Sequence, residues 1–374
     1  MNPGPHRQIR VAIVAASLRY VGGHSAQADY LLSRWRNDPE VEASLIVIDP
    51  SIPGTMQWLM RVPFVRTMVR EPLYLAALWR GLKDVDIAHI FSASYWSFWI
   101  APVPARLIAR LLKKQALIHY HSGEAEGHLR RSRLSRSVLK GSDRLIVPSR
   151  YLVDVFRKFG LRAQAVPNVV DLQQFPFRVR RPLRPNLICT RGFHRYYRVD
   201  LVVEAFALIQ KRFPGAHLHL LGEGAEEGKI RDLVKRLDLK TVNFAGVVSR
   251  YEIPHHYSAA DIFINASCVD NMPVSILEAF ASGTPVVSTA PEGLKYLIEH
   301  EHTGLLSEVG DANALAHNVI RLLEETDLSH KIAVNALETC KTYTWPQVRS
   351  QWRDLYFSLV GRDHKKWEEL AEVH

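Results

Sequence analysis

Short apolar runs alternate along the chain with longer segments in which apolar residues recur every three or four positions. In the first half, the runs at 10–18, 45–48, 87–91 and 116–120 have the length and composition of buried strands. The segment between the first two runs carries apolar residues at Ala28, Leu31, Leu32 and Trp35, which is the spacing of one helix face. Buried strands that alternate with amphipathic helices predict an α/β fold with parallel sheets.

The same alternation resumes after a Pro- and Arg-rich stretch at 175–185, which we interpret as a linker. A chain of 374 residues is also too long for one ordinary hydrophobic core. We therefore expect two Rossmann-like domains at 1–172 and 173–345, followed by a C-terminal helix at 346–374 that returns to the first domain.

The segment 261–289 is the most informative part of the chain, because it combines a strand, a loop, a helix, a turn and a second strand. Pro273 suits the first position of the helix and Gly283 its end. Glu278 lies among apolar residues of this helix, where a carboxylate is costly unless a specific group binds it. Asp270 lies in the preceding loop, so both acids can line one site.

The start of this helix is suited to anion binding. The first N–H groups, those of Val274 and Ser275, have no partner within the helix and attract phosphate. A carboxylate that accepts hydroxyls beside a phosphate-binding helix end suits a nucleotide sugar. The alternative is a buried Glu278 that pairs with a nearby Arg or Lys and has a structural role only.

This segment resembles the Glu-x7-Glu signature of the family 4 retaining glycosyltransferases, written E-G-(F/M/L)-(G/P)-x-x-L-L-E-A-x-A-x-G-x-P-V-V. The matching positions are Asp270, Asn271, Met272, Pro273, Ile276, Leu277, Glu278, Ala279, Ala281, Gly283, Pro285, Val286 and Val287. The resemblance is strong over residues 185–325 and implies two Rossmann-like lobes that face each other across a cleft, the GT-B architecture. It departs at Asp270, where the family has the longer Glu.

The resemblance implies a donor site in the second lobe. Arg191 stands where the family places a basic residue on the donor's diphosphate, and Glu278 where it accepts the ribose hydroxyls. The family's K-G-x-D motif should follow, but Tyr196, Tyr197 and Arg198 precede Asp200, so its Lys is absent. We expect Arg195 or Arg198 to replace it, since Arg can clamp a diphosphate with two hydrogen bonds.

Further site residues are implied in the first lobe and at the helix start. His121, at the end of the run 116–120, stands where the family places a His near the transferred sugar. Gly22 and Gly23 stand where a glycine loop of the family lets backbone approach the donor phosphates or the acceptor. A plain tight turn is the alternative for the glycines, and a histidine that only satisfies its own hydrogen bonds is the alternative for His121. We assign catalytic roles to His121, Arg191 and Asp270. The predicted donor-binding residues are Gly22, Gly23, Arg195, Arg198, Asn271, Val274, Ser275 and Glu278.

Cysteine spacing and charge distribution indicate which metals, compartment and partners to expect. Cys189, Cys268 and Cys340 lack metal-type spacing, so we predict no metal site and a reducing compartment. Residues 1–170 hold 24 Lys and Arg against 12 Asp and Glu, a net +12, whereas residues 171–374 hold 24 against 26, a net −2. This asymmetry indicates an acidic partner for the first half.

Two basic segments of the first half suggest what that partner is. Residues 56–80 mix aromatic side chains with Arg, and Arg130, Arg131, Arg133, Arg136 and Lys140 suggest one solvated helix face. Such segments can lie on an anionic membrane surface, or the first can form helices that cover the sheet. Apolar runs long enough to cross a membrane are absent from the sequence. We expect a cytoplasmic protein that contacts the inner face of the cell membrane and binds no nucleic acid.

The resemblance, together with the charge distribution, implies a hexosyltransferase that moves a sugar from a UDP- or GDP-sugar to a lipid-linked, polysaccharide or other cell-envelope acceptor. Retention of configuration is what the resemblance implies, and we expect transfer without a metal or another cofactor. Two alternatives stay open: a sugar-nucleotide epimerase of the same architecture, and a nucleotide-sugar-binding subunit without turnover.

Overall fold

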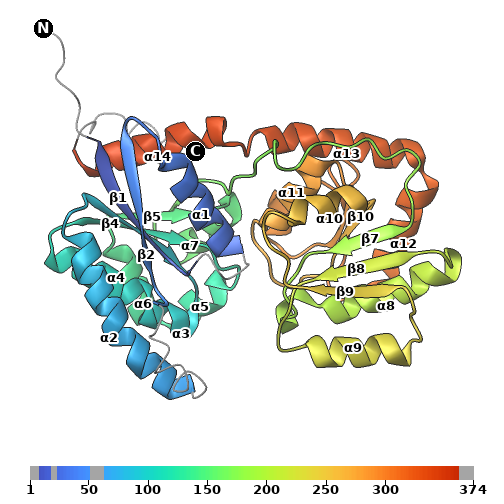
Figure 1. The fold of residues 1–374 in the computed structure, drawn as a ribbon, viewed down its shortest axis with the longest axis horizontal. Helices are drawn as coiled ribbons and strands as arrows, with labels where there is room; N and C mark the ends of the chain where they lie inside the picture. Colours follow the sequence, from blue (N-terminus) through green and yellow to red (C-terminus); the bar gives the residue numbers. More distant parts are fainter. Residues whose placement is uncertain (1–7, 18–22, 51–62, 362–374) are drawn as a thin grey trace, which may run out of the picture. The chain divides into compact units, whose positions relative to one another are not determined.

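The computed structural model describes residues 8–17, 23–50 and 63–361, without the side chains of residues 24 and 63–68. The chain divides into two compact units, Met1–Val166 with Arg349–His374, and Pro167–Val348. Each unit contains a six-stranded parallel sheet with helices packed against it (Figure 1). The predicted α/β architecture with two Rossmann-like units is therefore confirmed.

The first unit has the strand order β2-β1-β3-β4-β5-β6. Its strands are β1 Ile9–Ala15, β2 Val41–Val47, β3 Ile87–Ser92, β4 Gln115–Tyr120, β5 Arg144–Val147 and β6 Gln164–Ala165. Its helices are α1 Gly23–Trp35, α2 Pro63–Leu82, α3 Tyr95–Ile100, α4 Pro102–Leu111, α5 Ala125–Arg131, α6 Arg133–Lys140 and α7 Arg150–Lys158, joined by α14 Trp345–Leu359 from Arg349 onward.

Side chains alternate between the two faces of this sheet, because the period of a strand is two residues. On β3, Ala88 and Ile90 pack into the core beneath α2 and α4. His89 points to the opposite face, where its ring contacts Trp352 of α14. Both faces of β3 are buried, which explains why its sequence is apolar almost throughout.

The predicted basic helix face at 130–140 is wrong as a single helix. Ser132 separates α5 from α6, and its hydroxyl accepts a hydrogen bond from the backbone N–H of Ser135 at 3.0 Å. A serine that caps the second helix explains the break. Most of the basic side chains are exposed, but Arg136 is half-buried and lies over the ring of Phe159.

The segment 56–80 is only partly described. Its residues 56–62 lie outside the described ranges, and the rest belongs to α2. Tyr74 and Leu78 of α2 are buried against the sheet, whereas Leu73, Leu75 and Trp79 are exposed. Helix α2 thus covers the sheet and still presents apolar side chains to solvent. Within the part of the chain that the structure describes, no helix is long and apolar enough to cross a membrane.

The second unit has the strand order β12-β11-β10-β7-β8-β9. Its strands are β7 Asn186–Cys189, β8 His217–Leu221, β9 Val242–Gly246, β10 Ile262–Asn265, β11 Val286–Thr289 and β12 Leu305–Ser307. Its helices are η2 Arg195–Tyr197, α8 Val199–Arg212, α9 Glu227–Arg236, α10 Ile253–Ala259, α11 Val274–Ser282, η3 Leu294–Tyr296, α12 Ala312–Glu324 and α13 Thr326–Lys341.

Counted within the unit, this order is that of a Rossmann sheet, in which the chain reverses direction across the sheet between the first and fourth strands. These strands are β7 and β10, which pair in parallel. Ligands of such sheets bind beyond the carboxyl ends of the strands at this reversal. The loops that follow β7 and β10 are therefore where the fold favours a site.

Candidate active site

Helix α11 follows β10 and begins at the reversal point. Pro273 precedes it with φ −70° and ψ 130°, so the helix starts at Val274, one residue later than the sequence suggests. The extended backbone at Pro273 places the proline ring just outside the first turn. The helix ends at Ser282, and Gly283 has φ +71°, the left-handed conformation that glycine adopts without strain.

Arg191 follows β7 and lies next to the start of α11. Its side chain is buried, and its Nη2 forms an ion pair with the carboxylate of Asp270. Nη1 donates to the hydroxyl of Ser275 at 3.1 Å, and Nη2 lies 3.4 Å from the hydroxyl of Ser267. The fold thus joins three residues that the sequence assigns to the site: Arg191, Asp270 and Ser275.

Electrostatics favour the charged form of this arginine. Burial opposes the charge of Arg191, but Asp270 raises its pKa above the ordinary value. Burial raises the pKa of Asp270, and Arg191 counteracts that shift, as do hydrogen bonds from Asn271 and Ser267. A buried guanidinium whose counter-charge is one carboxylate is suited to an anionic ligand that competes with the carboxylate.

The region of the missing Lys is rearranged around Tyr197. The guanidinium carbon of Arg191 lies 4.0 Å from the centroid of the Tyr197 ring. Arg198 adopts the left-handed conformation, with φ 48°, where the K-G-x-D pattern has its glycine. Tyr197 therefore occupies the Lys position. The sequence alone places Tyr197 at the Lys position, because Asp200 fixes the alignment with the K-G-x-D pattern. A tyrosine at this position does not by itself indicate a contact with a cation.

The two arginines proposed to replace the Lys lie apart from this contact. Nε of Arg198 donates to the carboxylate of Asp200 at 3.0 and 3.1 Å. Arg195 belongs to η2 and is exposed. Neither has a contact with Arg191 or Asp270 among the interactions of the described residues, so their predicted donor-binding role stays a prediction.

Glu278 lies one turn inside α11 and is partly buried. Burial raises the pKa of this carboxyl to about 7, although contact with the Tyr257 hydroxyl and the charge of Arg250 lower it. In the described part of the chain, Glu278 makes no ion pair with Lys or Arg. The hydroxyl of Tyr257, which the sequence did not reveal, donates to the Ser275 carbonyl at 2.8 Å and so connects the surroundings of Glu278 to the helix start.

Close backbone contacts hold the loops of this site. A Cβ at Gly293 would overlap the carbonyl oxygen of Asp270, and one at Gly222 would lie 2.5 Å from the carbonyl oxygen of Arg191. Asn271 is buried next to Asp270, and its backbone N–H donates to the Asp270 carboxylate at 3.1 Å. Both loops are thus fixed by glycines that face them.

The remaining predicted residues belong to the first unit. His121 follows β4 directly and is buried, with its ring stacked on Phe91 at 5.0 Å between centroids. Gly23 is the first residue of α1 and has open space around it. Gly22 lies outside the described residues.

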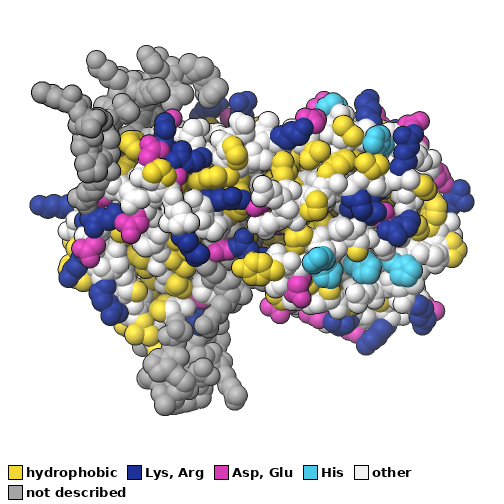
Figure 2. Space-filling view, turned by 45° about the horizontal axis from the view of Figure 1, so that its top comes forward, with side chains coloured by type: hydrophobic (Ala, Val, Ile, Leu, Met, Phe, Trp, Pro, Cys, Tyr) yellow, Lys and Arg dark blue, Asp and Glu magenta, His cyan; other side chains and the backbone are white. Residues whose placement is uncertain are grey.

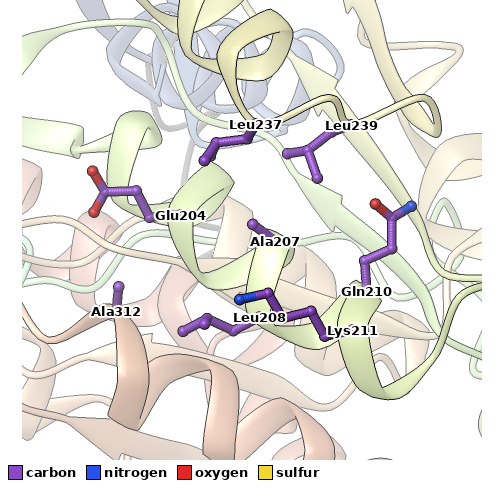
Figure 3. Close-up of a pocket in the computed structure, with 8 residues that line it drawn as sticks. All are labelled: Glu204, Ala207, Leu208, Gln210, Lys211, Leu237, Leu239 and Ala312. Atoms are coloured by element: carbon purple, nitrogen blue, oxygen red, sulfur yellow. The ribbon is translucent and has the colours of Figure 1, made fainter.

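Two other surface features lie on the second unit. A hollow of about 450 Å³ lies on the outer side of α8, lined by Glu204, Ala207, Leu208, Gln210, Lys211, Leu237, Leu239 and Ala312 (Figure 3). It shares no residue with the predicted site. Histidine side chains also gather on the second unit (Figure 2). Among the residues that the structure describes, however, no group of His, Cys, Asp and Glu could hold a metal ion.

Comparison with known families gives two adjoining matches. Residues 174–339 match the family model "Glycosyl transferases group 1", and residues 30–174 match "Glycosyltransferase Family 4". The first match contains Arg191, Asp270 and Glu278, and the second contains His121.

Curated relatives match in part of their length. The chain is 32% identical over 179 residues to N-acetyl-alpha-D-glucosaminyl L-malate synthase of Bacillus anthracis, which covers 47% of this chain and 46% of that protein. It is 32% identical over 150 residues to the lipopolysaccharide core biosynthesis glycosyltransferase LpsE of Rhizobium meliloti, covering 40% and 41%. The matches thus span less than half of these relatives.

Solved structures match over nearly the whole chain. Sucrose-phosphate synthase from Thermosynechococcus elongatus has a TM-score of 0.72 at 22% identity, covering 96% of this chain and 100% of that one. Anabaena HepE in complex with UDP-glucose has a TM-score of 0.73 at 17% identity, covering 94% and 100%. At these identities the likeness establishes the fold.

Proposed function

The chain belongs to the group 1 and family 4 glycosyltransferases, and from that membership we propose that it transfers a hexose from a UDP- or GDP-sugar to an acceptor of the cell envelope. The observation that carries the proposal is the buried Arg191, held by Asp270 and Ser275 at the start of α11. A helix N-terminus beside a buried guanidinium is an anion site.

In this proposal the donor's diphosphate binds at Arg191 and at the first N–H groups of α11. Negative charge develops on the diphosphate as the glycosidic bond breaks, and positive groups fixed in advance stabilise it. Tyr197 holds the guanidinium from its other side, which limits the orientations of Arg191. The arginine then needs little reorganisation when the donor binds, and no metal ion is needed to neutralise the leaving group.

The two carboxylates have separate roles in the proposal. Glu278 accepts hydrogen bonds from the ribose hydroxyls. Burial raises the pKa of this carboxyl, and hydroxyl donors of a bound ribose would stabilise its charged form. Asp270 exchanges its contact with Arg191 for the hydroxyls of the transferred sugar. His121 contacts that sugar from the first unit, and transfer proceeds with retention of configuration.

The acceptor is proposed to be a lipid-linked or polysaccharide component of the cell envelope. The name of one relative, LpsE, places that protein in lipopolysaccharide core biosynthesis. In the first unit, Trp79, Trp96, Leu107 and Leu111 are exposed on helices α2, α3 and α4. Together with the +12 charge of residues 1–170, they support contact with an anionic membrane surface.

The proposal is tested by incubating the protein with labelled UDP- and GDP-sugars and a lipid extract, with and without EDTA. We expect label to move to the extract with one donor, and Arg191→Ala to abolish most of the transfer. Conversion of the donor to an epimer without any acceptor would instead establish the epimerase alternative. Donor binding without turnover under all conditions would leave the binding-subunit alternative.

A further inference from the structure

Three buried polar side chains form a hydrogen-bonded chain between α14 and the sheet of the first unit. Nδ1 of His89 lies 2.8 Å from the hydroxyl oxygen of Tyr356, and Nε2 of His89 lies 3.1 Å from Nδ1 of His119. The three residues are at most 2% exposed. They come from α14, β3 and β4, so the chain joins the end of the sequence to adjacent strands.

The direction of this chain follows from its donors and acceptors. Among the hydrogen bonds of the described residues, the Tyr356 hydroxyl has Nδ1 of His89 as its partner. A buried hydroxyl proton needs an acceptor, so this hydroxyl donates to Nδ1 of His89. Burial lowers the pKa of His89 to about 3, so this ring is neutral and carries one proton, on Nε2. That proton is donated to Nδ1 of His119.

The last ring of the chain packs against His121. The centroids of the His119 and His121 rings lie 4.0 Å apart. The Trp352 ring of α14 contacts the His119 ring, and the Phe91 ring stacks on the His121 ring. The ring centroids lie 5.0 Å apart in each pair. The orientation of His119 therefore limits the positions that the His121 imidazole can take.

We propose that Tyr356 and His89 are positioning residues, which hold His119 in one tautomer and orientation and thereby fix the imidazole of His121. The inference rests on the proposed function, in which His121 contacts the transferred sugar. A misplaced group of this kind reduces the rate of the chemical step more than the binding of the donor. Three buried polar groups in a row also need every hydrogen bond made, so one lost donor affects the whole chain.

The test is Tyr356→Phe, which removes one hydroxyl and keeps the ring. Tyr74→Phe is the matched control, because Tyr74 is equally buried in the same unit and its hydroxyl donates to the Ala101 carbonyl at 2.9 Å. Histidine-selective ¹⁵N labelling reports the tautomer of each ring in the full chain, with signals assigned by His119→Gln and His121→Gln. Turnover and the donor KM are measured on the same variants.

We expect Tyr356→Phe to shift the ring signals of His119 and His121 and to lower kcat about tenfold with an unchanged donor KM. Tyr74→Phe should lose similar thermal stability and keep both the signals and kcat. Unshifted His119 and His121 signals in Tyr356→Phe would overturn the inference, and so would shifted signals with wild-type kcat. Wild-type turnover in His121→Ala would overturn the proposed role of His121 itself, whatever the ring signals show.

Discussion

The guanidinium of Arg191 lies over the ring of Tyr197, with 4.0 Å between the guanidinium carbon and the ring centroid. The negative face of an aromatic ring attracts a cation, by about 0.5 to 2 kcal/mol depending on solvent exclusion. A ring thus stands at the position of the family's second cation. The proposed diphosphate site therefore combines the buried guanidinium of Arg191 with an aromatic ring that supports it.

Replacing Tyr197 should change donor affinity according to the ring and not the hydroxyl. Tyr197→Phe keeps the aromatic face and should bind the donor as the wild type does. Tyr197→Ala removes the contact and should weaken binding roughly five- to tenfold, which corresponds to about 1 kcal/mol. Isothermal titration calorimetry with the donor measures both. Equal affinity in all three proteins would show that the ring does not support Arg191.

Loss of the guanidinium should affect turnover more than loss of the ring. Arg191→Ala removes a fixed donor to the developing anion and should lower kcat by about 10²-fold or more. Arg212→Ala, which removes an exposed arginine paired with Glu324, is the control and should keep wild-type kcat. Chelators should have no effect on the wild type. Activity that EDTA abolishes and a divalent ion restores would contradict a metal-free mechanism.

Donor binding should depend on the protonation of Glu278. Its pKa of about 7 in the folded protein means that the carboxylate form gains population as pH rises from about 6 to 8. Donor affinity should therefore increase over this window, since the carboxylate accepts hydroxyls more strongly than the acid. Glu278→Gln should bind more weakly at the upper end and lose the pH dependence. Calorimetry in buffers of different pH checks this, and a pH-dependent Gln variant would exclude Glu278 as the cause.

The same carboxyl should leave a signature in stability. Because its folded pKa lies above the unfolded value of 4.5, the folded state binds this proton more tightly than the unfolded chain. Its contribution to stability is present below the unfolded pKa and is lost as pH rises toward about 7. The melting temperature of the wild type should thus fall relative to Glu278→Gln across that window. Equal pH dependence of the two melting temperatures would mean that the folded pKa of Glu278 is not raised.

Gly293 should be intolerant of any side chain, because a Cβ there would overlap the backbone of Asp270 and lie 2.9 Å from Cα of Asn271. Gly293→Ala should displace the Asp270 loop and lower both stability and turnover. Gly215→Ala is the control, since a Cβ at Gly215 has nothing within 4 Å. Thermal melting and the transfer assay report the two effects. A fully active Gly293→Ala protein would mean that the loop can move without cost.

The first unit should bind anionic vesicles at low salt. Arg110 and Lys113 are exposed beside Leu107 and Leu111, and each basic residue near an anionic surface contributes about 1 kcal/mol. Charge reversal by Arg110→Glu with Lys113→Glu should weaken sedimentation with these vesicles, and added salt should do the same.

The matched control reverses an equal charge at the end of α9, by Lys235→Glu with Arg236→Glu, and should leave vesicle binding unchanged. Equal sedimentation of the wild-type protein with neutral and anionic vesicles would exclude the membrane surface. The acceptor would then be sought among soluble anionic glycans.

Several features of the fold follow from local sequence alone. The alternation of apolar strands and amphipathic helices specifies the α/β class, because each element buries its apolar side chains at its own period. Helix α11 is another local feature: Pro273 and Gly283 bound it, and Glu278 is visible as the acid among its apolar residues. The sequence also specifies Arg191 and Asp270 as candidates, through the order of residues within each motif.

The partners of these residues were decided by the tertiary structure. Arg191 and Asp270 are 79 positions apart, and His89 and Tyr356 are 267 apart. Such pairs meet only because the strand order places β7 beside β10 and because α14 packs on the first unit. Local periodicity predicts on which face of a helix or strand a side chain lies, but it does not predict which distant element covers that face. For this reason only the tertiary fold of each unit decides three contacts: the ring over Arg191, the hydroxyl beside Glu278, and the histidine chain that ends at His121.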